Sequence, residues 1–194
     1  MNTDLLVSNI SKYITLEPQE QEYFVSLLQS KKIRKRGYLL QEGDICNTST
    51  FVTKGCLRGF TVDTNGNEHI LSFAPEGWWI ADMYSYITQQ PGTQIIEAIE
   101  NTEVLQLSKT HQEILFQKVP KFERFFRILV EKSLVSHQQR LIETMSMSAE
   151  ERYATFQKRY PLLEERLPQK HIAAYIGVTP EFFSKMRTNV LRKK

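Results

Sequence analysis

The sequence predicts an α+β fold: an N-terminal β-roll (a double-stranded β-helix, or jelly roll) with flanking helices, a long connecting helix and a C-terminal helix-turn-helix. Three observations predict it. Between about residues 38 and 107, short runs of strand-forming residues alternate with breaks containing glycine or proline. From Pro120 to about Met145, apolar residues recur at helical spacing. Near the C-terminus, Gly177 separates two short amphipathic segments.

Residues 2–30 are predicted to be helical, with Glu17 and Pro18 starting a second apolar run inside them. The basic run at residues 31–36 has two interpretations, contact with nucleic acid or a solvated edge strand. The edge strand is favoured, because Ile33 interrupts the run of charge and Gly37 ends it.

The predicted strands are short and evenly spaced. Asn65-Gly66 between two such runs is the strongest hairpin signal, because both residue types tolerate positive φ. Even spacing of many short strands is typical of a closed roll that can enclose a pocket. The predicted strands are Tyr38–Leu40, Thr50–Val52, Leu57–Val62, His69–Phe73, Gln94–Ala98 and Glu103–Leu107.

Helical character returns near Ser108, and a long helix then runs from Pro120 to about Met145. A helix of roughly 25 residues would be about 37 Å long, more than a small roll needs for cover. The extra length of this helix predicts that it pairs with a second copy in a dimer, as in a coiled coil; packing against the roll is the alternative. The helix Ala149–Arg159 follows. The apolar stripe of the long helix consists of Phe122, Phe125, Phe126, Leu129, Leu134, Leu141 and Met145.

The segment Gln169–Arg192 is predicted to be a helix-turn-helix. Gly177 allows the tight turn, Thr179 is placed as an N-cap, and Pro180 fits the first helical position. The predicted buried residues are Ile172, Ala173 and Ile176 in the first helix, and Phe183, Met186 and Val190 in the second. The opposite face of the second helix is polar and basic, which suits the DNA major groove; the alternative is an ordinary αα-hairpin.

The charge distribution supports a polyanionic partner at the C-terminal end. Residues 148–194 hold 10 Lys and Arg against 5 Asp and Glu, although the whole chain has a net charge of only +3. Two cysteines are too few for a disulfide scaffold or a four-thiolate cluster. Without a signal-peptide pattern or a long apolar run, we expect a cytoplasmic protein with no membrane contact.

Nearly the whole chain resembles the Crp/Fnr family of bacterial transcription regulators. The matching residues are Gly37, Gly43, Val52, Gly55, Arg58 and Gly66 in the roll, and Ile172-Ala173, Ile176-Gly177, Thr179, Glu181 and Ser184-Lys185 in the helix-turn-helix. The resemblance implies a sensory domain at 1–118, a dimerisation helix at 119–147 and a DNA-binding domain at 148–194. It implies a homodimer on a near-palindromic operator, with half-sites about 34 Å apart.

The DNA contacts that the resemblance implies come from Thr179, Glu181, Ser184, Lys185, Thr188 and Arg192. Members of this family usually carry β-hairpin wings beside the helix-turn-helix, whereas only residues 161–167 precede it here. We therefore expect fewer backbone contacts and a greater dependence on the basic tail. Double-stranded DNA and a second copy of the chain are the implied partners, and RNA polymerase is an additional candidate.

The resemblance also bears on the ligand of the roll. In cyclic-nucleotide members, a Gly-Glu pair and a later Arg-Ser pair hold the cyclic phosphate and ribose. Here Ala81-Asp82 and Gly92-Thr93 stand at those places, so the arginine that pairs with the phosphate is missing. Because an unpaired buried phosphate is costly, we predict no tight binding of cyclic AMP.

The candidate pocket residues are Arg58, Trp78, Trp79, Asp82, Met83 and Thr93. The tryptophans either line a site for an aromatic ligand or close the roll as an apolar plug, and the plug is favoured. No catalytic residue, metal site or cofactor is identified, and an unknown small-molecule effector remains open.

Two other functions compete with a DNA-binding regulator. A cupin-like enzyme on the same roll would need several histidines around a metal, but only His69 lies in the roll. A module that binds only proteins fits poorly with the five basic residues at 181–194, namely Lys185, Arg187, Arg192, Lys193 and Lys194.

Overall fold

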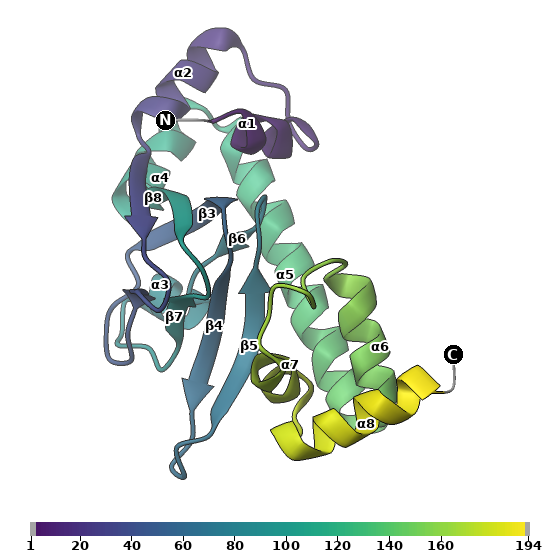
Figure 1. The fold of residues 1–194 in the computed structure, drawn as a ribbon. Helices are drawn as coiled ribbons and strands as arrows, with labels where there is room; N and C mark the ends of the chain where they lie inside the picture. Colours follow the sequence, from purple (N-terminus) through teal and green to yellow (C-terminus); the bar gives the residue numbers. More distant parts are fainter. Residues whose placement is uncertain (1–2, 193–194) are drawn as a thin grey trace. The chain divides into compact units, whose positions relative to one another are not determined.

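The computed structural model describes residues 3–192, with the side chains of the last helix described as far as Asn189. The chain forms two compact units (Figure 1). Met1–Thr61 and Ser72–Glu131 form the first, called the roll unit; Val62–Leu71 and Lys132–Lys194 form the second, called the helical unit.

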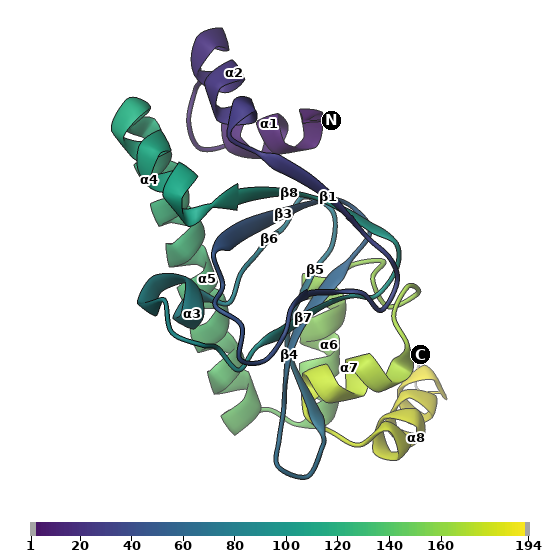
Figure 2. The same ribbon diagram turned by 90° about the vertical axis from the view of Figure 1, so that its left-hand side faces the viewer.

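Two four-stranded sheets build the roll (Figures 1 and 2). The first has the order β1-β8-β3-β6 and the second the order β2-β7-β4-β5. Val52 and Val104 from the first sheet meet Leu57 and Ile96 from the second in one buried cluster, which is the core of the roll. The strands are β1 (Gln29–Ile33), β2 (Tyr38–Leu40), β3 (Thr48–Lys54), β4 (Leu57–Val62), β5 (Glu68–Ala74), β6 (Trp79–Ile80), β7 (Ile95–Ala98) and β8 (Thr102–Ser108).

A second apolar cluster joins the first sheet to helices. Leu6, Phe24 and Leu115 pack with Phe51 and with the first turns of the long helix α5. The helices are α1 (Asp4–Ser11), α2 (Pro18–Ser26), α3 (Met83–Thr88), α4 (Lys109–Lys118) and α5 (Lys121–Ser146). The predicted α+β roll with flanking helices is therefore confirmed.

The helical unit contains the later part of α5, α6 (Ala149–Arg159), α7 (Gln169–Ile176), α8 (Pro180–Arg192) and the tip of the β4–β5 hairpin. Its core is aromatic: Phe156 contacts the rings of Tyr160 and Tyr175, and Tyr153 contacts Phe183. Residues 161–167 form turns, so no strand lies between α6 and α7.

The helical character predicted for residues 2–30 is confirmed for α1 and α2 and is wrong for the remaining described residues. Residues 12–17 separate α1 from α2, and a strand begins at Gln29. That strand, β1, confirms the predicted edge strand for residues 31–33 of the basic run, and among the described residues it pairs with β8 alone, at the border of its sheet. Two short elements, β6 and α3, were not predicted. Among the described residues, no helix combines the length and apolarity needed to cross a bilayer.

Candidate nucleic-acid interface

The turn between α7 and α8 has the predicted geometry. Gly177 adopts a left-handed conformation (φ 73°, ψ 43°), and its N–H donates to the carbonyl of Ala173. Thr179 caps α8, because its Oγ1 accepts the backbone N–H of Phe182 at 3.2 Å. These bonds fix the direction in which α8 leaves α7.

One face of each helix is buried, as predicted for Ile172, Ala173, Ile176, Phe183 and Met186. The ring of Phe183 meets Tyr153 edge-on, with ring centroids 5.2 Å apart. The side chain of Val190, also predicted to be buried, lies outside the described residues. Burial of one face leaves the opposite face of α8 open.

The exposed front of α8 carries the predicted DNA contacts. Glu181, Ser184, Lys185 and Thr188 are exposed, as is the cap Thr179. The hydroxyl of Thr188 donates to the carbonyl of Ser184 at 3.0 Å, within its own helix. The predicted contact Arg192 has its side chain outside the described residues.

Sequence reasoning missed two side chains on this front, Phe182 and Asn189, both of which are exposed. At about 100° per residue they lie about 60° and 40° from Lys185 around the helix. That angular position was the available signal. Phe182 and Asn189 are neither charged nor hydroxyl-bearing, so the polar and basic pattern of the predicted front did not include them.

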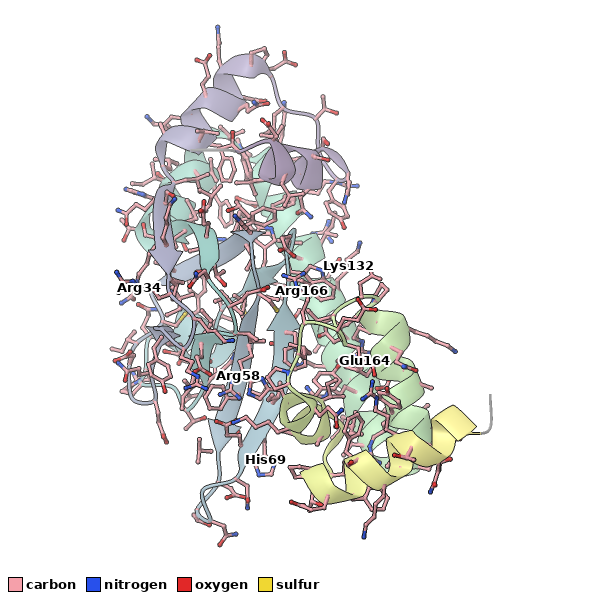
Figure 3. All side chains as sticks on the ribbon, in the orientation of Figure 1. Arg34, Arg58, His69, Lys132, Glu164 and Arg166 are labelled. Atoms are coloured by element: carbon pink, nitrogen blue, oxygen red, sulfur yellow. The ribbon has the colours of Figure 1, made fainter. Side chains whose placement is uncertain are left out.

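Arg187, one of the five basic residues at 181–194, is half-buried and does not belong to the open front of α8. Its Nε forms an ion pair with Glu164 Oε1 at 3.2 Å. The same carboxylate accepts from the hydroxyl of Tyr153 at Oε1 and from Gln157 at Oε2, the latter at 2.8 Å. Burial and the bond to Glu164 raise the pKa of Tyr153 to about 12. Burial disfavours ionisation of Glu164, but its hydrogen bonds and Arg187 outweigh that effect and lower its pKa. Figure 3 labels Glu164.

Arg140 of α5 holds α7 in place within the helical unit. Its guanidinium donates to the backbone carbonyls of Ile70 and Leu71 in β5, and to that of Tyr175 in α7 at 2.8 Å. It also lies 4.0 Å from the centroid of the Tyr175 ring. One cation therefore connects the hairpin, α5 and the first helix of the helix-turn-helix.

In the roll unit, the structure brings together Asp82 and Gly92, which the resemblance predicts to stand at the places of the phosphate-binding pairs. Asp82 is 4% exposed and caps α3, accepting the N–H of Ser85 at 3.1 Å. A Cβ atom added to Gly92 would lie only 2.1 Å from the Oδ2 atom of Asp82. Thr93, beside Gly92, is exposed.

The other pocket candidates are distributed between core and surface. Arg58 (labelled in Figure 3) is 4% exposed, and its Nε donates to Glu97 at 2.6 Å. Trp79 packs against Phe51, with ring centroids 5.3 Å apart, and belongs to the apolar cluster around α5. This packing favours the plug interpretation for Trp79. Trp78 is exposed and Met83 half-buried.

The structure also shows a groove of about 350 Å³ at the edge of the roll, beside the basic run. Lys32, Arg34 and Lys54 line it together with Glu103, which pairs with Lys32 at 3.1 Å. The side chains of Cys46 and Cys56 are both buried. Within residues 3–192, no three His, Cys, Asp or Glu side chains are grouped closely enough to hold a metal ion.

Comparison with known proteins agrees with this architecture. Residues 30–118 match the family model described as the cyclic nucleotide-binding domain. The anaerobic regulatory protein of Haemophilus influenzae is 28% identical over 94% of this chain and 75% of its own length. The fumarate and nitrate reduction regulatory protein of Vibrio cholerae is 24% identical over 94% of this chain and 77% of its own length.

Among solved structures, FixK2 from Bradyrhizobium japonicum superimposes with a TM-score of 0.75 at 18% identity, over 86% of this chain and 85% of that one. This likeness concerns the fold. Residues 30–118 are similar to a cyclic nucleotide-binding domain, and nearly the whole chain is similar to relatives named as regulatory proteins; both findings support the resemblance to Crp/Fnr regulators.

Proposed function

We propose that this chain acts as a homodimer that binds double-stranded DNA through α8 and thereby regulates transcription from a near-palindromic operator. The observation that carries the proposal is the geometry of α8: a capped helix with a buried apolar back and an exposed polar front. A helix of this kind fits the major groove, where base edges are distinguishable. The named relatives are regulatory proteins, and we infer no enzymatic activity.

The side chains of the front have different roles in this proposal. Lys185 contacts a base edge or a phosphate, and Glu181 accepts from a cytosine amino group. Thr179, Ser184, Thr188 and Arg192 contact the DNA backbone and set the orientation of the helix. Because lysine lacks the planar fork of arginine, we do not expect bidentate guanine recognition at Lys185.

The exposed apolar face of α5 supports the homodimer. Leu134, Leu141 and Met145 are 66%, 61% and 80% exposed. At about 100° per residue they fall within about 40° of one another, so they form one stripe. An apolar stripe of this kind is the usual seam of paired helices. A two-fold dimer would place two copies of α8 on half-sites about one DNA turn apart.

The geometry of the roll supports our prediction that cyclic AMP is not its effector. The carboxylate of Asp82 already occupies the N-terminus of α3, where backbone N–H groups would otherwise receive an anion. The cation of Arg58 is paired with Glu97. A cyclic phosphate placed here would meet a carboxylate. The effector is therefore another small molecule or none. Because the target is chromosomal DNA, we place the protein in the cytoplasm.

Selection from random duplexes, followed by mobility shift, tests the proposal. We expect an inverted repeat whose half-sites are about one helical turn apart. Lys185→Ala should weaken binding to the selected site by about tenfold or more. Lys12→Ala, which removes an exposed lysine from the roll unit, is the matched control and should bind as the unaltered protein does. Failure to enrich any sequence, or equal binding by Lys185→Ala, would contradict the proposal.

A further inference from the structure

We infer that Phe182 contacts the methyl group of a thymine in each half-site, and so adds an apolar element to sequence recognition. This inference rests on the proposed function, because it requires α8 to enter the major groove. It assigns a specificity-determining role to a residue that neither the polar pattern of the sequence nor the charge of the helix indicates.

Two adjacent phenylalanines at the start of α8 have opposite environments. Phe183 is fully buried against Tyr153, whereas Phe182 is 52% exposed. The backbone N–H of Phe182 is bonded to Thr179 Oγ1, so the first turn holds its Cα in a defined position. Because the cap fixes the first turn of α8, Phe182 is held on the exposed side of the helix, and about half of its surface stays in contact with water.

The position of Phe182 coincides with the part of a recognition helix that contacts bases. Residues near the N-terminus of such a helix approach the base edges most closely. Phe182 lies one turn before Lys185 and about 60° from it around the helix. The axial separation of the two residues is about 4.5 Å, about 1.3 times the rise of one base pair and less than the rise of two. The two side chains therefore face neighbouring base pairs when α8 lies along the groove.

The chemistry of Phe182 selects one feature of the groove. Every base pair offers polar atoms in the major groove, but the C5 methyl of thymine is its one apolar group. A phenyl ring cannot satisfy the donors and acceptors of the other base edges, and covering them would remove their water without replacement. The exposed ring therefore favours thymine and disfavours bases that present only polar edges.

Replacement of thymine by deoxyuridine tests this inference, because it removes the methyl group and leaves the hydrogen-bonding edge unchanged. The operator is first selected with the unaltered protein, and each thymine of a half-site is then replaced in turn. We expect one position at which deoxyuridine weakens binding about three- to tenfold, as loss of a buried methyl group implies. Phe182→Ala should bind the thymine and deoxyuridine duplexes equally at that position.

Two further variants separate recognition from folding. Phe182→Leu keeps an apolar side chain and should retain part of the discrimination between thymine and deoxyuridine. Leu162→Ala removes an exposed apolar side chain outside α8 and should discriminate as the unaltered protein does. Circular dichroism and the affinity for non-operator duplex show whether each variant is folded.

The outcomes distinguish this inference from the proposed function. If the unaltered protein selects an operator but tolerates deoxyuridine everywhere, or if the operator lacks a constant thymine, the inference is wrong and DNA binding stands. The same holds if Phe182→Ala keeps the full deoxyuridine penalty. If no duplex is selected at all, both fail.

Discussion

The backbone of Gly177 sets the angle between the two helices of the proposed DNA-binding element. Its φ of 73° lies in the left-handed region, and a Cβ atom added there would meet nothing within 4 Å. A side chain at this position would therefore be opposed by the backbone conformation and not by a steric clash. Glycine is favoured here because it alone adopts that conformation without cost.

Substitution at Gly177 should follow this torsional argument. Gly177→Ala should lower the free energy of unfolding by about 1–2 kcal/mol, the cost of the left-handed region for an ordinary residue. Gly177→Asn should cost less, because asparagine enters that region more readily. Urea unfolding of the full chain measures both. Equal losses for the two variants would indicate a packing defect instead.

Asp63, at the tip of the β4–β5 hairpin, is the residue with the clearest expected pH behaviour. His69 Nε2 lies 2.9 Å from its carboxylate, and the backbone N–H groups of Asn65 and Asn67 donate to it at 2.9 Å. The bond to His69, followed by the bonds from Asn67, holds the pKa of Asp63 well below its ordinary value. Because the folded-state pKa is lowered, the ionised carboxylate stabilises the hairpin above the unfolded-state pKa. That contribution is lost as the pH falls through the folded-state value.

A carboxyl titration followed by NMR checks this expectation. The midpoint of Asp63 in the unaltered protein should lie below that of an unfolded-chain aspartate. His69→Ala should move it upward, and Asn67→Ala should move it upward by less, because the backbone bond at residue 67 remains. A midpoint that does not respond to His69→Ala would show that the hydrogen bond is not formed in solution.

At the scale of whole elements, α5 is divided into two environments. Phe122, Phe125 and Phe126 are buried in the apolar cluster of the roll unit. Leu134, Leu141 and Met145, further along the same helix, are exposed. A single helix thus contributes to a core at one end and offers an uncovered apolar stripe at the other. A second copy of α5 is the occupant that the proposed homodimer supplies.

Charge placed on this stripe should break the dimer without unfolding the chain. We expect the double variant Leu134→Lys and Leu141→Lys to sediment as a monomer, because two desolvated ammonium groups would face each other across the seam. Its operator affinity should fall by more than tenfold, since one half-site is then bound alone. Gln139→Lys, on the opposite side of α5 and also exposed, should remain a dimer. A dimeric double variant would place the interface elsewhere.

The sequence predicted best those helices whose first residue is set by a capping side chain close to it in the chain. The start of α6 follows from Ser148 and Glu151, which cap each other, and the start of α8 follows from Thr179. The short elements α3 and β6 were not predicted, because they contain too few residues to show a repeat of apolar positions. The break after α1 was missed because the apolar spacing continues through Ile14.

The side-chain partners in the candidate sites could not be predicted from the sequence. Arg58 and Glu97 are 39 residues apart, and Arg140 reaches a carbonyl 70 residues away. Such pairs depend on how strands and helices cross, which local propensity does not encode. The exposed front of α8 was largely predictable because helical periodicity alone separates its two faces. The domain boundaries at 118 and 147, and the roles of the site residues, stay predictions.

At the scale of the whole molecule, the domain match suggests a nucleotide ligand for the roll, whereas the residues of the roll argue against a cyclic phosphate. Residues 30–118 match a cyclic nucleotide-binding domain, but the positions expected to hold the phosphate contain Asp82 and Gly92. The carboxylate of Asp82 accepts the backbone N–H of Ser85 at the N-terminus of α3, and the buried Arg58 is paired with Glu97. In our proposal, the roll keeps the fold while its own side chains occupy the polar contacts that a cyclic phosphate would need.

Nucleotide-free protein should consequently bind its operator as well as protein supplied with cyclic AMP. A ligand that binds the folded state raises the melting temperature by mass action, so at about one hundred times its Kd it would add about 2.7 kcal/mol and a shift of several degrees. We expect no such shift with millimolar cyclic AMP and no change in operator affinity. Asp82→Asn keeps an N-cap and removes the charge, so it should leave the melting temperature close to that of the unaltered protein. A shift that appears only in Asp82→Asn would identify the carboxylate as the group that excludes the nucleotide, whereas a shift in the unaltered protein would overturn the argument from Asp82 and Gly92.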